Sequence, residues 1–197
     1  MRILAALAFL LVAATALAGV VPGDQAPDFT LTDTAGQTHT LSALLADGKT
    51  VVLEWFNPDC PFIVKHHKTF KTMNETFAAV EDQGVVWLAV NSNAAGKQGA
   101  GLERNQKAVT EYSLPFPLLM DPDGSVGKAY GARTTPHMFV ITAKGTVAYT
   151  GAIDDDRSAD TLGKQNYVAA ALADVLAGRP VATPESKPYG CSVKYAD

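Results

Sequence analysis

The segment EWFNPDCPFIVKHH, residues 54–67, decides the fold of this chain. It places Cys60, one of only two cysteines, between an apolar run and a stretch with helical spacing. The run TVVLEWFN (50–57) is typical of a buried strand. Pro61 suits the first position of a helix, because the missing N–H costs nothing there. We therefore expect Cys60 at the turn from a central strand into a helix.

Strand and helix patterns alternate on both sides of this turn. Because strands separated by helices form mainly parallel sheets, we expect an α/β three-layer sandwich with a mixed central sheet. An N-terminal hairpin and an extended C-terminal tail are added to it. The expected elements are strands at 85–92 and 116–121, helices at 62–80, 102–112 and 162–178, and hairpins around Ala35-Gly36 and Lys144-Gly145.

The first 18 residues are predicted to be a secretory signal peptide. Arg2 precedes an unbroken apolar stretch that ends in the small-x-small sequence Ala16-Leu17-Ala18. The stretch is short for a membrane span, and no second apolar run of about 20 residues follows, so no membrane anchor is expected. We expect an exported, soluble protein, periplasmic if the source is a Gram-negative bacterium and otherwise secreted.

The rest of the chain predicts one domain, 19–178, and an extended, proline-containing tail, 179–197, which carries Cys191. Gly190 would let the tail backbone approach the active-site turn closely. Loss of Arg2 leaves 15 basic against 20 acidic residues, a net charge of −5. Such a charge does not attract nucleic acid, so no nucleic-acid partner is expected.

The position of Cys60 favours a reactive thiol over a small buried apolar side chain. Free N–H groups and the positive end of the helix dipole stabilise a thiolate at a helix N-terminus. Ile63 lies one turn further along the helix, where a local partner thiol would have to be. A partner for Cys60 is therefore not local.

These motifs resemble the thioredoxin-like redoxins, and more closely the exported peroxiredoxin-like group related to alkyl hydroperoxide reductase and thiol-specific antioxidant proteins. The resemblance covers nearly the whole mature chain, through PGDQAPDFTLTDTAGQTHTLSAL, WFNPDCPF, TTPHMFVI, GAIDD and GCSVKY. It implies a thioredoxin-like fold with Cys60 as the active-site cysteine and Glu54 as a buried carboxylate. It also implies a cis bond between Thr135 and Pro136 that aims the Thr135 backbone at the cysteine.

The chain departs from both family patterns at the site. Ile63 stands where thioredoxins carry their second cysteine. Asn57 stands where typical peroxiredoxins carry a threonine, and Pro136 where an arginine is expected. Arg133 could supply the missing charge or be a solvated loop residue. We therefore expect peroxide turnover to be weak compared with thiol–disulfide exchange.

Other polar residues are weaker candidates. Glu54 can serve in proton transfer if it is buried, the alternative being an exposed edge position. His66 is expected to be a core histidine, and His67 to lie about 10 Å along the helix from Cys60, too far for direct proton transfer. His137 could approach the site. The acidic run 154–156 is expected to be a solvated turn rather than a calcium site.

Two functions remain. In the first, the chain is a thiol-dependent oxidoreductase without cofactor: Cys60 attacks a peroxide or a protein disulfide, Cys191 resolves the oxidised form, and an unidentified thiol donates electrons. A structural disulfide between the two cysteines is the competing interpretation. In the second function, a protein of the same fold binds or delivers copper through Cys60, Cys191 and a histidine, because such soft ligands suit Cu(I). The lack of a well-spaced histidine weakens it, and no metal is expected.

Overall fold

The computed structural model describes residues 19–196. The predicted signal peptide, residues 1–18, lies outside the described residues. Between residues 19 and 196, no helix has the length and apolar character needed to cross a membrane.

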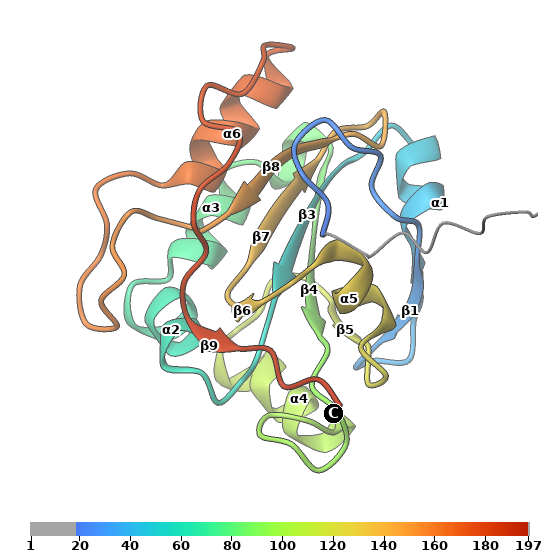
Figure 1. Ribbon diagram of the computed structural model, residues 1–197, viewed down its shortest axis with the longest axis vertical. Helices are drawn as coiled ribbons and strands as arrows, with labels where there is room; N and C mark the ends of the chain where they lie inside the picture. The colour runs from blue at the N-terminus through green and yellow to red at the C-terminus, as the bar shows by residue number, and fades with distance from the viewer. Residues whose placement is uncertain (1–18, 197) are drawn as a thin grey trace, which may run out of the picture.

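A seven-stranded sheet runs through the centre in the order β2-β1-β5-β4-β3-β7-β8 (Figure 1). The three inner strands β3, β4 and β5 are parallel to one another, whereas β1 and β7 pair with them antiparallel. A separate small sheet pairs β6 with β9 antiparallel. The strands are β1 (Thr30–Asp33), β2 (Thr38–Thr40), β3 (Thr50–Trp55), β4 (Val85–Asn91), β5 (Leu118–Met120), β6 (Thr134–Thr135), β7 (Met138–Ile141), β8 (Val147–Gly151) and β9 (Cys191–Ser192).

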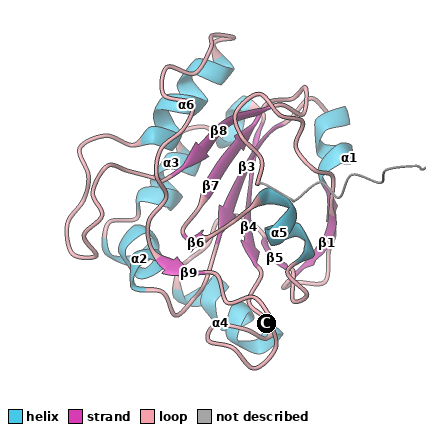
Figure 2. Cartoon of the chain, viewed as in Figure 1, coloured by secondary structure: helices cyan, strands magenta, loops and turns pink. Residues whose placement is uncertain are grey.

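Helices cover both faces of the sheet, which gives three layers (Figure 2). Alternate residues of β3 supply the two cores: Val52 packs with one layer of helices, and Val51 and Leu53 pack with the other. The predicted α/β sandwich with a mixed sheet is confirmed. One layer holds α2 (Pro61–Val64), the π turn η1 (Lys65–Thr69), α3 (Thr72–Ala78), α4 (Leu102–Glu111) and α6 (Tyr167–Leu176); the other holds α1 (Leu41–Ala46) and α5 (Ser125–Tyr130), and the 3₁₀ turn η2 (Glu81–Gln83) precedes β4.

The single helix expected over 62–80 is wrong, because the chain changes its winding twice there. After α2, the Phe70 N–H bonds to the Lys65 carbonyl, one residue further back than in an α-helix. Lys71 then takes a left-handed conformation, with φ 54°, and ends the run before α3. The wide turn η1 buries three consecutive polar residues, Lys65, His66 and His67.

The helix expected over 162–178 begins later, at Tyr167. Asn166 caps it, since its side-chain oxygen accepts a hydrogen bond from the Ala169 N–H at 2.9 Å. The preceding residues form a loop in which the Gly163 N–H donates to Asp154. Gly178 follows the helix with φ 69°, the left-handed conformation expected of a closing glycine.

Both predicted hairpins are present, as β1–β2 and β7–β8. The C-terminal tail is extended, as expected, and runs from α6 across β8 to β6 (Figure 1). Its backbone bonds to Thr150 from residues 184 and 186, and Val193 donates to the Arg133 carbonyl. The tail therefore carries Cys191 back over the strand that precedes Pro136. The domain boundary at residue 178 stays a prediction.

Candidate active site

Cys60 is the residue immediately before helix α2, and Pro61 is the first helical residue, as the sequence predicts. Its backbone N–H bonds to the Asn57 carbonyl, and its carbonyl accepts from Ile63 and Val64. The side chain is fully buried. The thiol donates to the carbonyl oxygen of Thr135 at 2.9 Å.

Thr135 lies between the two cysteines. Its bond to Pro136 is cis, as the family resemblance implies. In the β6–β9 sheet Thr135 is paired directly with Cys191, and its hydroxyl donates to the Cys191 carbonyl at 3.5 Å. Burial, hydrogen bonding to Cys60 and the charge of Cys60 together raise the pKa of the Cys191 thiol to about 12. The structure thus brings the two sulfurs together as free thiols.

Gly190 makes this approach of the tail possible. Its backbone has φ 130°, a conformation that other residues rarely adopt. A Cβ atom at this position would collide with the carbonyl oxygen of Thr135. The close crossing expected from the sequence is therefore present, and it requires glycine.

Glu54 is fully buried in β3, on the sheet face that carries Cys60. One carboxylate oxygen lies 2.6 Å from His67 Nε2, and the other accepts from Trp87 Nε1 at 3.0 Å. Neither oxygen is bonded to the Cys60 sulfur. A direct role of Glu54 in proton transfer stays a prediction.

Asn74 contacts the other ring nitrogen of His67. The Asn74 amide nitrogen donates to the carbonyls of Tyr112 and Ser113, so its oxygen must face His67 Nδ1, at 2.8 Å. The His67 ring is thus held at both nitrogens, by Asn74 at Nδ1 and by Glu54 at Nε2. The distance from Cys60 along the helix gives no hint of this contact. The signal in the sequence is the placement of Glu54 on a strand and His67 on the helix that follows it.

A second buried polar cluster joins η1 to the tail. Lys65 Nζ lies 3.6 Å from the Asp154 carboxylate and donates to the carbonyls of Asp156 and Ser158. The Tyr189 hydroxyl donates to Asp154, and His66 Nε2 lies 2.9 Å from that hydroxyl. Burial and the bond to Asp154 raise the pKa of Tyr189, so it stays a donor.

The expected solvated turn at 154–156 is therefore wrong for its first residue. Asp154 is buried, because Lys65 supplies a cation and Tyr189 a donor, while Asp155 stays exposed. Tyr189 lies two residues before Cys191, so its hydrogen bonds to the cluster hold the tail in place next to this cysteine. The residues of this cluster come from three segments that are far apart in the sequence, so no local pattern predicts it.

Two histidines lie in the interior away from the thiols. His66 is a core histidine, as expected, and its Nδ1 has no partner among residues 19–196. His137 does not approach Cys60: its Nδ1 accepts from the Arg133 N–H, and Nε2 donates to the Thr150 hydroxyl at 3.2 Å. Burial, with the charge of Arg133, lowers the pKa of His137 to about 3; burial lowers that of His66 to about 4, although Asp154 opposes it.

We expect these histidines to weaken the fold in mild acid. Their folded pKa values lie below the unfolded value of 6.5, so the unfolded chain binds protons first as pH falls below about 6.5. Between pH 7 and pH 5 each histidine should lower the free energy of unfolding by about 2 kcal/mol. The variant His137→Gln loses one of the two contributions. Its free energy of unfolding, measured with urea, should therefore show about half of the pH dependence that the two histidines cause together. An equal dependence in both proteins would contradict the assignment.

The positions that differ from the peroxiredoxin pattern are also described. Asn57 is buried, and its oxygen accepts from the Asp59 N–H at 2.9 Å, while its amide nitrogen has no partner among the described residues. Arg133 is exposed and does not reach Cys60 with a hydrogen bond. No group of three or more potential metal ligands occurs within residues 19–196.

Comparisons with known proteins agree with this geometry. The chain is 33% identical over 128 residues to the thiol-disulfide oxidoreductase ResA of Geobacillus thermodenitrificans, an alignment that covers 65% of this chain and 67% of the relative. A hypothetical protein from Sinorhizobium meliloti 1021 has a solved structure with a TM-score of 0.78 and 31% identity, covering 90% of this chain and 96% of that one. An uncharacterized conserved protein from Geobacillus kaustophilus gives 0.79 and 31%, covering 89% and 92%.

The predictions of a thioredoxin-like redoxin and of a thiol-dependent oxidoreductase are thereby confirmed. The model of the AhpC/TSA family matches residues 22–150, which include the active-site turn, the cis-proline and the central sheet. The chain therefore belongs to the AhpC/TSA family.

Proposed function

We propose that the chain is an exported thiol–disulfide oxidoreductase in which Cys60 is the nucleophile and Cys191 resolves the intermediate. The observation that carries this proposal is the meeting of both cysteines at Thr135, through the Cys60 thiol and the β6–β9 pairing. Nothing in the spacing of 60 and 191 along the chain enforces such a meeting. A tail that ends in an ordinary surface contact would not need Gly190 to cross so closely.

The proposed exchange moves two electrons from the cysteines to a substrate disulfide. The Cys60 thiolate attacks one substrate sulfur, forms a mixed disulfide and releases the other sulfur as a thiolate, which takes up a proton. Cys191, after losing its proton, attacks the Cys60 sulfur, and the second substrate thiolate leaves. The products are a reduced substrate and a Cys60–Cys191 disulfide, which an external thiol donor reduces again.

Access to Cys60 requires movement of the tail. The Cys60 side chain has no exposed surface, whereas Cys191 is partly exposed. Within residues 19–196, β6 pairs with the two-residue strand β9, so few ladder hydrogen bonds must break to separate the two strands. We expect β9 to separate from β6 when a substrate disulfide reaches Cys60.

Reduction of peroxide is the second candidate, and membership of the AhpC/TSA family favours it. In that reaction Cys60 takes the terminal oxygen of a hydroperoxide, releases an alcohol or water and becomes a sulfenic acid. Condensation with the Cys191 thiol gives the same disulfide and one water. The buried Asn57 replaces the threonine of the typical peroxiredoxin pattern, and Arg133 lies exposed, so the two groups that polarise a peroxide are missing.

Side-by-side assays test this ordering. We expect the reduced protein to reduce insulin disulfides at a rate well above its consumption of hydrogen peroxide, because Cys60 lacks peroxide-polarising groups. Cys60→Ser should abolish both activities. Fast, saturable hydrogen peroxide reduction that depends on Cys60, combined with slow insulin reduction, would reverse the assignment in favour of a peroxidase.

A further inference from the structure

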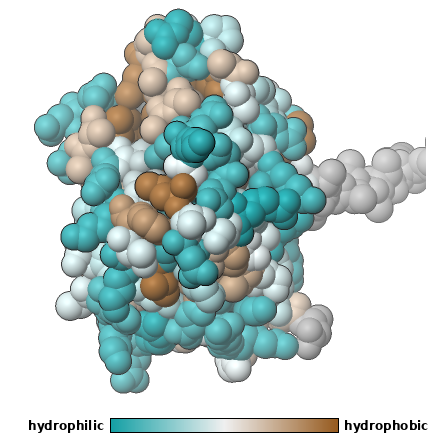
Figure 3. Space-filling model, turned by 90° about the vertical axis from the view of Figure 1, so that its left-hand side faces the viewer, coloured by the Kyte–Doolittle hydropathy of each residue, from teal (hydrophilic) through white to brown (hydrophobic). Residues whose placement is uncertain are grey.

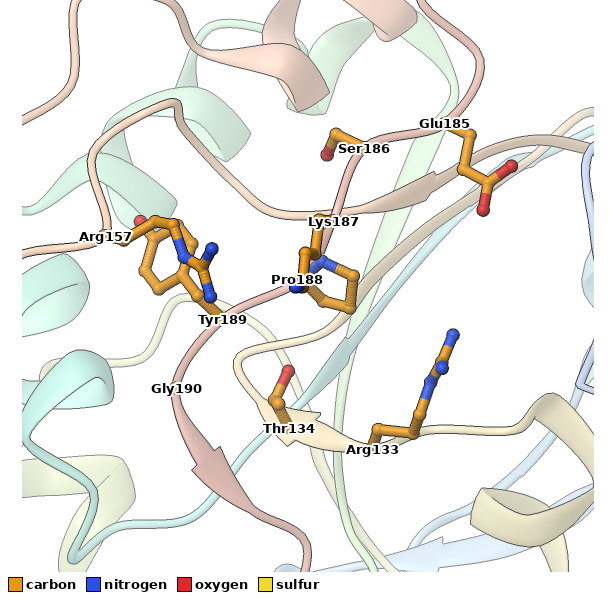
Figure 4. A pocket seen from close by; sticks show the side chains of 9 residues that line it. All are labelled: Arg133, Thr134, Arg157, Glu185, Ser186, Lys187, Pro188, Tyr189 and Gly190. Atoms are coloured by element: carbon orange, nitrogen blue, oxygen red, sulfur yellow. The ribbon is translucent and has the colours of Figure 1, made fainter.

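A pocket of about 770 Å³ adjoins the redox pair. It forms where the tail crosses β6, and Thr134 and Gly190, the neighbours of Thr135 and Cys191, line it. Its volume falls in the range of small-molecule sites. Figure 4 shows that side chains from three separate segments surround it: the turn before β6, the loop after β8 and the tail. A molecule held in this pocket would lie beside Cys191.

The pocket is rich in unpaired positive charge. Arg133, Arg157 and Lys187 line it against a single acidic residue, Glu185. None of the three cationic side chains forms a hydrogen bond or an ion pair with another residue of the described part, 19–196. The protein as a whole has a formal net charge of −4, so this concentration of cations runs against the overall balance.

The other two described arginines each pair with a carboxylate of this chain. Arg104 pairs with Asp59 at 2.7 Å, and Arg179 pairs with Asp174 at 2.8 Å. The two arginines of residues 19–196 that lack such a carboxylate, Arg133 and Arg157, both line this one pocket. Two guanidinium groups without internal partners beside one cavity suit a ligand that brings its own carboxylates.

Polar and charged side chains make up most of the pocket lining. On the face that Figure 3 turns toward the viewer, hydrophobic residues gather in small areas separated by hydrophilic ones. We expect charge to contribute to the choice of reactant at this pocket.

We propose that this pocket, lined by Arg133, Arg157 and Lys187, binds the carboxylates of an anionic peptide disulfide while its sulfur reacts at the cysteine pair. This inference rests on the proposed function and adds the substrate class. The exchange itself is the one already written, with two electrons passing from Cys60 and Cys191 to the bound disulfide.

Three small disulfides test the pocket: oxidised glutathione, which is anionic, bis(2-hydroxyethyl) disulfide, which is neutral, and cystamine, which is cationic. The measurement is the second-order rate constant for oxidation of the reduced full-length protein, followed by trapping free thiols. Oxidised glutathione should react faster than the neutral disulfide, and its advantage should shrink as ionic strength rises. Cystamine should show the opposite salt dependence.

Variants assign the effect to the pocket. Arg133→Gln, Arg157→Gln and Lys187→Gln should each lower the ratio of the anionic to the neutral rate constant by about fivefold, which matches a Coulomb interaction of about 1 kcal/mol in water. Removal of all three charges should lower it by about 100-fold if the contributions add. Glu185→Gln should raise the ratio. Lys144→Gln, an exposed cation outside the pocket, is the control and should leave it unchanged.

The possible outcomes distinguish a failure of the anionic binding site from a failure of the proposed oxidoreductase function. Exchange with the neutral disulfide combined with a ratio that the pocket variants do not change would overturn the anionic site and leave the oxidoreductase in place. No exchange with any of the three disulfides would overturn the proposed function itself, and the substrate class with it.

Discussion

Replacing Cys60 with serine should lower the rate of thiol–disulfide exchange by more than about 1,000-fold, because a serine hydroxyl is not a nucleophile toward disulfides at neutral pH. The thiol sits at the first turn of α2 and faces the Thr135 carbonyl, so no other described side chain occupies the reacting position. Steady-state reduction of insulin disulfides gives the rate. A circular dichroism melt of the variant shows that loss of activity does not come from loss of the fold.

The matched variant is Cys191→Ser. It should keep the first step, attack by Cys60, and lose the second, so turnover stops at a mixed disulfide that mass spectrometry detects on the Cys60 peptide. Full turnover by Cys191→Ser would contradict the resolving role of Cys191. Full turnover by Cys60→Ser would show that Cys191, and not Cys60, is the nucleophile.

The second large effect is on stability. Lys65→Met should lower the free energy of unfolding by about 3 to 5 kcal/mol, because it leaves the buried Asp154 carboxylate without its cation. The Asp156 and Ser158 carbonyls also lose their donor. Urea unfolding at pH 7 measures the change. Tyr189 depends on Asp154, so the thiol of Cys191 should also become more accessible to alkylation.

Lys68→Met is the control three residues further along the same turn. Lys68 is exposed and lies 3.8 Å from Glu111, so its loss should cost less than about 1 kcal/mol. The double variant Lys65→Met/Asp154→Leu removes both buried charges and should be more stable than Lys65→Met alone. If Lys65→Met and Lys68→Met have equal effects, the buried pair contributes nothing beyond a surface one.

Local patterns were sufficient wherever one segment determines its own structure. The apolar run before Cys60 predicts the buried strand β3, and Pro61 predicts the start of α2. The proline content of the tail predicts an extended segment, and Gly190 predicts a close crossing. The cis bond before Pro136 came from the family resemblance, since most such bonds are trans.

The missed features depend on winding and on distant partners. The spacing of apolar residues after Cys60 predicts a regular α-helix. The chain instead forms the wide turn η1, in which Lys65 and His67 are buried. His67 then reaches Glu54, and Lys65 reaches Asp154, across distances that no local spacing encodes. An acidic run predicts a solvated turn, because the sequence around residue 154 does not contain the buried cation, Lys65, that pairs with Asp154.

The account depends most directly on a reversible disulfide between Cys60 and Cys191. The decisive measurement is equilibration of the full chain in dithiol–disulfide buffers, followed by acid quenching, alkylation and tryptic mapping under non-reducing conditions. The account predicts that peptides 50–65 and 165–194 are joined in oxidising buffers and separate in reducing ones, in a two-electron transition that leaves the fold intact. Both thiols remaining free in every oxidising buffer, with no sulfenic acid trapped at Cys60, or a bond that yields only on unfolding, would contradict it.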